Sequence, residues 1–230
     1  TRQPQNGRLT FSVGAREIDL RLASHPTIHG ENIVVRILDK SRSLLTLHDL
    51  GYSPPLMTQV QKALKRPAGI FIITGPTGCG KTTSLYSMLS YMNAPHLNIM
   101  TLEEPVEYQL PLIRQAEVRP LGGMGFEEGV RSILRQDPDI ILIGEIRDPG
   151  TAKMALRAAM TGHQVFSTLH TNDAFGSIHR LMDLGLHPSM LASNLTAVIA
   201  QRLIRRLCLL CKTQRQMTRH EMDLLGLSSP

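Results

Sequence analysis

The sequence predicts an α/β fold in which short buried strands alternate with helices. Four apolar runs, at 70–74, 98–102, 139–144 and 164–169, are nearly continuous, which is typical of strands buried on both faces of a parallel sheet. Segments with apolar residues at helical spacing separate these runs. A glycine-rich loop at 75–82 follows the first run and precedes one of the helical segments. Together these observations indicate one large α/β domain.

Residues 1–38 precede this domain and have the pattern of β-strands. Apolar and polar residues alternate between Ile18 and Leu22, a turn is expected at 25–30, and 33–38 is a second strand-like run. A sheet of this size does not stand alone, so we expect part of a separate, smaller domain. Because the chain starts at a threonine and not at a methionine, we expect that its amino-terminal portion is missing.

Residues 39–53 are predicted to be a linker and a hinge, and residues 54–230 are predicted to be the large domain. Its helices are expected where apolar residues recur at helical spacing, around 54–66, 83–92, 154–161 and 178–184. From about 186 the pattern remains helical and ends in a polar, basic segment. The large domain therefore includes a helical carboxyl-terminal region.

The composition is that of an ordinary globular protein. The chain has 230 residues and a formal net charge of +6, and much of the positive excess lies in Arg202, Arg205, Arg206 and Lys212. It has no tryptophan and few other aromatics, so the composition does not indicate stacking surfaces for single-stranded nucleic acid, although the positive charge permits contact with an acidic partner. Three cysteines suit a reducing compartment, and no apolar run approaches the roughly 18 residues that span a bilayer. We expect a cytoplasmic protein, peripheral at any membrane, without a nucleic-acid partner.

The glycine-rich loop matches the complete phosphate-binding pattern. Its residues are Gly75, Pro76, Thr77, Gly78, Cys79, Gly80, Lys81 and Thr82, followed by Thr83. The glycines allow consecutive N–H groups to point at one anion, and the positive end of the following helix adds attraction. Lys81 is expected to reach the β and γ phosphates, and the hydroxyl of Thr82 suits Mg²⁺. The predicted ligand is a magnesium nucleoside triphosphate.

Carboxylates follow two of the predicted strands. Glu145 ends the third apolar run, where a carboxylate can reach a metal ion or its waters beside a phosphate-binding loop. Glu103, Glu104 and Glu107 follow the run at 98–102. Like charges this close disfavour full ionisation unless a cation lies among them, and one carboxylate could then orient the attacking water. The alternative in both places is an acidic loop that is merely solvated.

Two histidines and a pair of cysteines leave more than one interpretation open. His163 and His170 flank the last predicted core strand, and their odd spacing argues against paired metal ligands. One of them could contact the γ-phosphate, although isolated histidines are more often packed or solvated. Cys208 and Cys211 have the spacing of half a zinc site, and no second pair follows before Pro230. Zinc is therefore not expected in this chain.

Together these motifs resemble those of the secretion ATPase family, the cytoplasmic hexameric motors of type II secretion and type IV pilus assembly. Gly75–Thr83 is similar to the family's Walker A box, Thr101–Glu107 to its aspartate box, Asp137–Asp148 to its Walker B region and Thr161–Ala174 to its histidine box. Segments within Arg16–Lys40 are similar to the end of its second amino-terminal domain. The resemblance covers almost the whole chain. It implies a RecA-like P-loop ATPase domain joined to part of a small α+β amino-terminal domain.

The resemblance also implies roles for particular residues. Arg21 and Arg36 would reach a nucleotide phosphate when the amino-terminal domain closes, and they would stabilise charge on the transferring phosphoryl group. Glu107 would be the general base. Glu145 would be the Walker B carboxylate and would bind Mg²⁺ with Thr82, directly or through water. The implied nucleotide contacts are residues 75–83, Glu103, His163 and His170.

Two departures from the family pattern are present. Glu104 stands where the family usually has aspartate, and Cys208 and Cys211 are the only Cys-x-x-Cys pair where assembly ATPases commonly have two. Either the chain is cut short or this member has lost the zinc site.

The implied function is Mg²⁺-dependent ATP hydrolysis that drives domain motion in a hexameric motor at the inner membrane. Its expected partner is an inner-membrane platform protein. Whether the motor serves secretion or pilus assembly stays open, as does its cargo. The alternatives are a nucleotide-binding assembly scaffold with little turnover and a nucleic-acid translocase.

Overall fold

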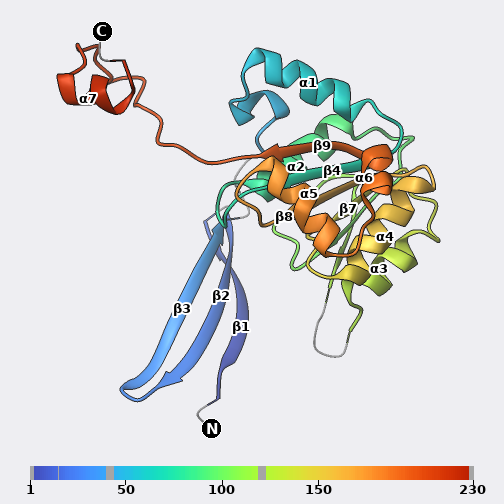
Figure 1. Cartoon of the computed structure of the whole chain (residues 1–230). Coiled ribbons are helices and arrows are strands. Elements are labelled where there is room, and N and C mark those ends of the chain that lie inside the picture. The colour runs from blue at the N-terminus through green and yellow to red at the C-terminus, as the bar shows by residue number, and fades with distance from the viewer. Residues whose placement is uncertain (1–2, 15, 40–43, 119–122, 228–230) are drawn as a thin grey trace.

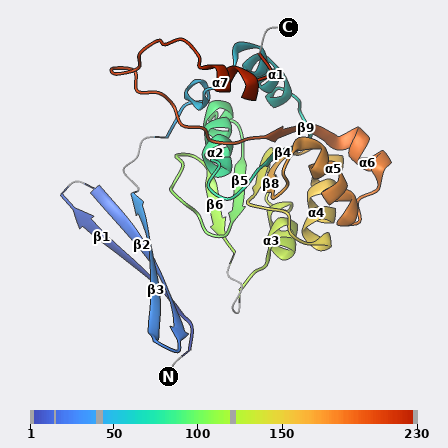
Figure 2. The same ribbon diagram turned by 60° about the vertical axis from the view of Figure 1, so that its left-hand side comes forward.

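Two β-sheets of different kinds organise the chain (Figure 1). The computed structural model describes residues 3–14, 16–39, 44–118 and 123–227. The amino-terminal residues form a three-stranded sheet, and the rest of the chain forms an α/β domain around a six-stranded sheet. Figure 2 shows the small sheet lying to one side of the larger domain.

The amino-terminal sheet is an antiparallel meander, as the pattern of residues 1–38 predicts. Its strands are β1 (Gln5–Val13), β2 (Arg16–Thr27) and β3 (Gly30–Asp39). The turn between β2 and β3 lies at 28–29, so residues 25–27, which were expected in the turn, extend β2. The small α+β domain that the sequence predicts contributes only strands within the described residues 3–39.

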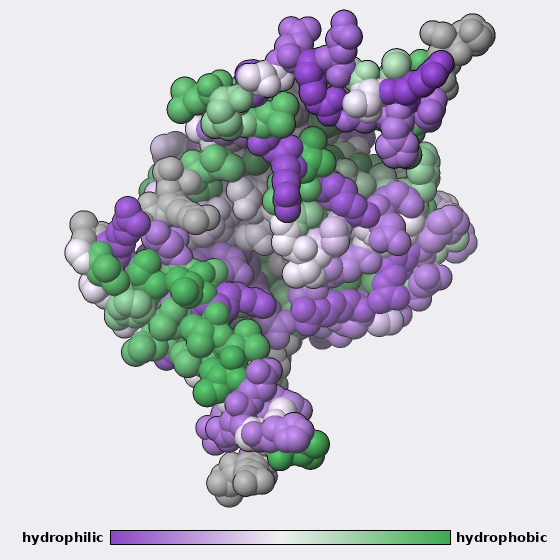
Figure 3. Space-filling model, turned by 90° about the vertical axis from the view of Figure 1, so that its left-hand side faces the viewer, coloured by the Kyte–Doolittle hydropathy of each residue, from purple (hydrophilic) through white to green (hydrophobic). Residues whose placement is uncertain are grey.

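The two faces of this sheet differ in character. Leu20 lies opposite Leu9 on one neighbouring strand and opposite Ile37 on the other, so apolar side chains share a face. Figure 3 shows apolar side chains gathered on an exposed surface of the sheet. Residues of the other face form ion pairs with the larger domain. The sheet therefore turns its charged face toward the α/β domain.

The larger domain contains a parallel sheet with the strand order β6-β5-β7-β8-β4-β9. Its strands are β4 (Gly69–Thr74), β5 (Ile99–Glu103), β6 (Arg114–Glu117), β7 (Ile140–Ile143), β8 (Gln164–Leu169) and β9 (Leu195–Ala200). The four predicted core strands are confirmed, each to within one residue at either end. Because the strands are parallel, their carboxyl ends meet at one edge of the sheet.

Helices cover both faces of the parallel sheet (Figure 1). They are α1 (Pro54–Leu64), α2 (Lys81–Met92), α3 (Phe126–Ile133), α4 (Pro149–Met160), α5 (Ala174–Asp183) and α6 (Pro188–Asn194), and α7 (Arg219–Leu224) lies in the tail. One buried apolar cluster joins α1 and α2 to the sheet, and a second joins α3, α4, α5 and α6 to its other face. No helix in the described ranges is long and apolar enough to cross a membrane.

The carboxyl-terminal region departs from the sequence prediction. Helices are expected from about 186, and α6 agrees, but residues 195–200 form β9 and residues 201–218 contain no helix. The prediction is wrong over these residues because the β-branched run in β9 pairs with β4 at the edge of the sheet. Farther along, Leu203 and Leu207 have helical spacing but are exposed, and a short helix without packing is marginal.

The second half of the predicted linker at 39–53 is attached to the larger domain. Residues 40–43 lie outside the described part of the chain. After them, the short helix η1 (Leu47–Leu50) places Leu47 in the apolar cluster of α1 and α2. The hydroxyl of Ser87 on α2 donates to the carbonyl oxygen of Leu45 at 2.7 Å.

Substitution of Phe166 tests whether this side chain lies in the apolar core. It is fully buried on β8, and its ring stacks on Phe71 with centroids 5.4 Å apart. We expect Phe166→Ala to lower the free energy of unfolding by about 3–5 kcal/mol, because it removes buried apolar contacts and leaves a cavity. Phe175→Ala is the matched control, since this side chain is 78% exposed, and it should change stability by less than about 0.5 kcal/mol. Urea unfolding measures the stability of both variants. Equal losses of stability in Phe166→Ala and Phe175→Ala would contradict the burial of Phe166 in the core.

Candidate functional site

The glycine-rich loop joins the end of β4 to the start of α2. Thr74 ends the strand and Lys81 begins the helix, so the amino terminus of α2 lies at the carboxyl edge of the sheet. Gly75 has a φ of 142°, and a side chain there would come within 2.5 Å of the carbonyl oxygen of Gln201. Gly80 has a φ of 86°, which other residues rarely adopt. The loop therefore requires glycine for conformation and for space.

A cleft of about 420 Å³ lies beside this loop. It gathers site residues that the sequence predicts from four separate segments, and these are Thr77, Gly78, Gly80, Lys81, Thr82, Thr83, Glu103, Glu107, Glu145 and His170. Nζ of Lys81 donates to the carbonyl oxygens of Gly75 at 2.9 Å and Pro76 at 3.1 Å. Gly75, Pro76 and Cys79 belong to the loop without lining the cleft, and Cys79 is buried.

Glu145 follows β7 and contributes a carboxylate to the cleft. Its Oε2 atom is buried and has no hydrogen-bond partner among the described residues. Nε2 of His170 lies 3.6 Å from that atom, and Arg147 forms an ion pair with Oε1. A buried carboxylate oxygen without a hydrogen bond is costly unless a cation or water meets it.

The donor set at this place fits magnesium. The free oxygen of Glu145 and the hydroxyl of Thr82 are oxygen ligands, which Mg²⁺ prefers. Within the described ranges, no three His, Cys, Asp or Glu side chains cluster as a complete metal cage. Mg²⁺ in nucleotide sites takes few protein ligands and completes its shell with phosphate and water, so this sparse set is suited to it.

Glu103 is buried at the end of β5 and is held by three hydrogen bonds. It accepts from the hydroxyl of Tyr86, from Oγ1 of Thr101 at 2.6 Å and from Nε2 of Gln115 at 3.1 Å. Burial raises the pKa of Glu103, and the three hydrogen bonds act against that rise. This carboxylate therefore faces the cleft while its oxygens are already bonded to the protein.

Sequence reasoning misses Tyr86 and Gln115, which fix the acidic segment after β5. Tyr86 on α2 also accepts a hydrogen bond from the N–H of Glu107 at 3.4 Å. Gln115 on β6 accepts from the N–H of Leu110 at 2.7 Å. Tyr86 occupies an ordinary apolar position of a helix, and a lone glutamine carries no pattern, so neither gives a signal in the sequence.

Glu107 contacts the amino-terminal sheet. Its carboxylate oxygens accept hydrogen bonds from Arg21 on β2 at 3.1 Å and 3.5 Å. The Arg21 side chain is 19% exposed and that of Glu107 is 31% exposed, so the pair is partly shielded from solvent. The sequence predicts both residues for the site, and the structure joins them directly.

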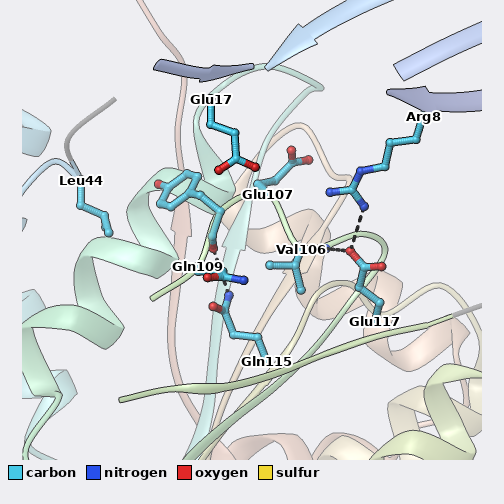
Figure 4. A pocket seen from close by; sticks show the side chains of 9 residues that line it. Arg8, Glu17, Leu44, Val106, Glu107, Gln109, Gln115 and Glu117 are labelled. Carbon is cyan, nitrogen blue, oxygen red and sulfur yellow. Dashed lines mark hydrogen bonds and ion pairs between the residues drawn. The ribbon is translucent and has the colours of Figure 1, made fainter. Parts of the chain in front are cut away.

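A second ion pair joins the same two parts of the chain. Arg8 on β1 contacts Glu117 on β6 at 3.5 Å and also pairs with the buried Asp19 at 2.7 Å. Glu117 accepts from the N–H of Val106 at 3.3 Å, so it holds the segment that contains Glu107. Figure 4 shows Arg8, Val106, Glu107 and Glu117 around a cavity of about 530 Å³ between the sheet and the larger domain. Sequence reasoning does not identify Arg8 or Glu117.

Arg36 belongs to a row of three arginines. Arg8, Arg21 and Arg36 lie opposite one another on β1, β2 and β3. Like charges in direct opposition destabilise a sheet unless anions lie near them. Arg36 lines a cavity of about 510 Å³ together with Arg21 and Pro105, and it does not line the cleft beside the loop.

The structure separates the two predicted histidines. His170 lines the cleft, whereas His163 precedes β8 at the opposite edge of the sheet. Nδ1 of His163 lies 2.9 Å from the carbonyl oxygen of Ala158 and 3.1 Å from Oγ1 of Thr161, at the end of α4. The 6 residues of β8 span about 20 Å at roughly 3.3 Å per residue. His163 is therefore not placed at the cleft of its own chain.

Cys208 and Cys211 lie exposed on the carboxyl-terminal tail. Hydrogen bonds from the backbone N–H groups of Leu210 and Cys211 lower the pKa of the Cys208 thiol. The described part of the chain brings no group of three metal-ligating side chains together around them. The expectation that this chain binds no zinc stays a prediction.

Comparison with known proteins identifies the family. The family model for type II/IV secretion system proteins matches residues 1–227. Type II secretion system protein E of Klebsiella pneumoniae is 48% identical over 226 residues, which are 97% of this chain and 46% of that protein. The type IV pilus assembly ATPase PilB of Thermus thermophilus is 45% identical over 227 residues, which are 99% of this chain and 26% of PilB. This chain spans about half the length, or less, of these relatives.

Solved structures share the fold. The crystal structure of the pilus retraction motor PilT with bound ADP has a TM-score of 0.72 and 33% identity, over 86% of this chain and 59% of that one. The ATPase DotB of Legionella pneumophila has a TM-score of 0.73 at 24% identity, over 88% and 59% of the two chains, and shows the fold alone. These likenesses confirm the predicted α/β ATPase fold.

The family model matches nearly the entire chain, and relatives that are almost half identical cover it as fully. The chain therefore belongs to the family of type II/IV secretion system proteins.

Proposed function

We propose that this chain is the ATP-binding and ATP-hydrolysing part of a motor that serves type II protein secretion or type IV pilus assembly. The observation that carries the proposal is the cleft in which the phosphate-binding loop, Glu107 and Glu145 meet. Relatives named for type II secretion and for pilus assembly support it, as does the ADP bound to PilT.

ATP binds with its phosphates on the glycine-rich loop. Nζ of Lys81 exchanges the carbonyl oxygens of Gly75 and Pro76 for the β and γ phosphates. Thr82 and Oε2 of Glu145 would hold Mg²⁺, directly or through water. When bound, Mg²⁺ neutralises negative charge on the phosphates.

Two carboxylates of the acidic segment, Glu103 and Glu107, have different roles. Glu103 is buried with three hydrogen bonds, so it anchors the segment. Glu107 lines the cleft and is more accessible, so it orients the attacking water and accepts its proton. His170, beside Glu145, contacts the γ-phosphate.

Arg21 links hydrolysis to the amino-terminal sheet. Its guanidinium is bonded to Glu107, and a nucleotide phosphate offers it a second anionic partner. When Arg21 leaves Glu107 and pairs with the phosphate, Glu107 becomes free to act as the base. The same movement brings the positive charge of Arg21 to the transferring phosphoryl group. Arg36, next to Arg21 in the sheet, supplies the second charge.

Work arises from movement of the sheet against the larger domain. The charged face of the sheet contacts that domain through the Arg21–Glu107 and Arg8–Glu117 pairs, which are polar and reversible. Closure on ATP and reopening after hydrolysis transmit a rigid-body movement to an inner-membrane platform protein. We propose a homohexamer that works in the cytoplasm, peripheral at that membrane. The relatives named for type II secretion and for pilus assembly support a place within such a machine.

One assay separates this function from its alternatives. A motor hydrolyses Mg²⁺-ATP and is indifferent to added DNA or RNA. A nucleic-acid translocase is strongly stimulated by DNA or RNA at low salt, with a steep loss as salt rises. An assembly scaffold binds ATP and does not turn it over.

Lys81→Ala tests the phosphate-binding loop. We expect it to weaken binding of a fluorescent ATP analogue by at least about tenfold, because a charge-assisted contact to phosphate is lost. Lys62→Ala, on the exposed face of α1, is the control and should bind as the unmodified chain does. Unchanged binding by Lys81→Ala would place the nucleotide elsewhere.

Glu107→Gln tests the base. We expect ATP affinity within about threefold of the unmodified chain and a fall in kcat of at least about 100-fold, because the amide cannot accept the proton of water. Glu128→Gln on α3, exposed and outside the cleft, should leave both quantities unchanged. Turnover by Glu107→Gln close to that of the unmodified chain would remove Glu107 from this role.

Glu103→Gln tests whether Glu103 anchors the acidic segment, through the dependence of folding stability on pH. Burial raises the pKa of Glu103 in the folded state above the value of about 4.3 that an unfolded glutamate has. The folded state then binds the proton more tightly, so this contribution to stability is present at low pH and is lost as pH rises through the folded-state pKa. We therefore expect the unmodified chain to be more stable relative to Glu103→Gln at pH 5 than at pH 8, measured by urea unfolding. A difference that grows with pH would show that the hydrogen bonds outweigh burial.

A further inference from the structure

Gln201 contacts the phosphate-binding loop, although it lies far from the loop in the sequence. It is the first residue after β9, and its N–H donates to the carbonyl oxygen of Thr74 at 3.0 Å, which continues the pairing of β9 with β4. Its own carbonyl oxygen is the atom that a side chain at Gly75 would meet at 2.5 Å. The backbone of Gln201 is therefore packed against the first glycine of the loop.

The side-chain amide of Gln201 is bonded on both sides. Nε2 donates to the carbonyl oxygen of Cys79 at 2.6 Å. Oε1 accepts from Oγ of Ser84 at 3.0 Å and from the hydroxyl of Tyr52 at 3.4 Å. The carbonyl oxygen of Cys79 can only accept a hydrogen bond, so the amide nitrogen of Gln201 must face it. The amide oxygen then faces the hydroxyls of Ser84 and Tyr52, which donate to it. One side chain thus joins the loop, helix α2 and the segment that precedes α1.

The bond to Cys79 sets the direction of a loop N–H group. In a trans peptide the C=O and the following N–H point in opposite directions. The carbonyl of Cys79 is drawn to Gln201, so the N–H of Gly80 is turned away from Gln201. Phosphate-binding loops bind anions through such N–H groups, and Gly80 lines the cleft.

We propose that Gln201 is a positioning residue for the phosphate-binding loop. It holds the Cys79–Gly80 peptide in the orientation that presents the Gly80 N–H to a phosphate, and it does not touch the nucleotide itself. The inference rests on the proposed binding of ATP in the loop, and it adds a residue 122 positions beyond Cys79. The alternative role is that Gln201 only attaches β9 to the domain.

The two roles differ in what a substitution changes. Gln201→Met keeps the length of the side chain and removes the amide, so a positioning role predicts weaker binding of phosphate groups. Gln164→Met is the matched control. Gln164 is buried at the opposite edge of the sheet, where Nε2 also donates to a backbone carbonyl, that of Leu64 at 3.1 Å. An attachment role predicts loss of stability in both variants without loss of affinity.

The experiment measures the dissociation constant of a fluorescent ATP analogue, its displacement by inorganic pyrophosphate, and the thermal unfolding midpoint of each variant. We expect Gln201→Met to weaken the analogue and pyrophosphate in equal proportion, by about tenfold or more, because both reach the loop through phosphate. Gln164→Met should lower the unfolding midpoint at most and leave both affinities unchanged.

Other results overturn the inference. If Gln201→Met folds and binds both ligands as tightly as the unmodified chain does, Gln201 has no positioning role. The proposed function is then unaffected. If Gln201→Met does not fold, Gln201→Asn decides in its place, because it keeps a neutral amide but is one methylene too short to reach Cys79 while it stays bonded to Ser84 and Tyr52. Absence of ATP binding by the unmodified chain overturns the proposed function and this inference together.

Discussion

The site depends on the common direction of the strands in the six-stranded sheet. Because β4, β5, β7 and β8 are parallel, the phosphate-binding loop, the acidic segment, Glu145 and His170 all follow carboxyl ends at one edge. Reversal of a single strand would carry the loop that follows it to the other edge, where His163 lies. Strands β4 and β8 are buried on both faces, so apolar packing against helices on each side maintains this arrangement.

Charge balance is the second constraint, and it joins the two sheets. The part of the larger domain that contacts the small sheet carries Glu107 and Glu117, and the facing strands carry a row of arginines. Each arginine that reaches across finds a carboxylate, which offsets the repulsion within the row. Polar contacts of this kind are weaker than a buried apolar interface, which supports the proposal that the sheet moves against the domain.

The sequence predicts those features that depend on neighbouring residues. The glycine-rich loop and the four core strands follow from local patterns, and the structure confirms both. Features that depend on distant pairing are not predicted. Residues 195–200 become a strand only because β4 offers an open edge, and Gln115 matters only because β6 lies beside β5. His163 shows the same limit, because two histidines seven residues apart share a sequence motif and lie at opposite ends of a strand.

Glu104, which stands where the family resemblance leads us to expect aspartate, reaches a residue that also contacts Glu145. Its Oε2 lies 3.4 Å from Nη1 of Arg147, and the same guanidinium pairs with Oε1 of Glu145. The extra methylene of glutamate, relative to aspartate, extends the carboxylate toward this arginine. Arg147 then lies between the two acids and pairs with one oxygen of Glu145, while the other oxygen has no hydrogen-bond partner among the described residues and lies 3.6 Å from Nε2 of His170. The longer side chain at 104 therefore shares Arg147 with Glu145, and Oε2 of Glu145 remains the oxygen that we propose for the cation.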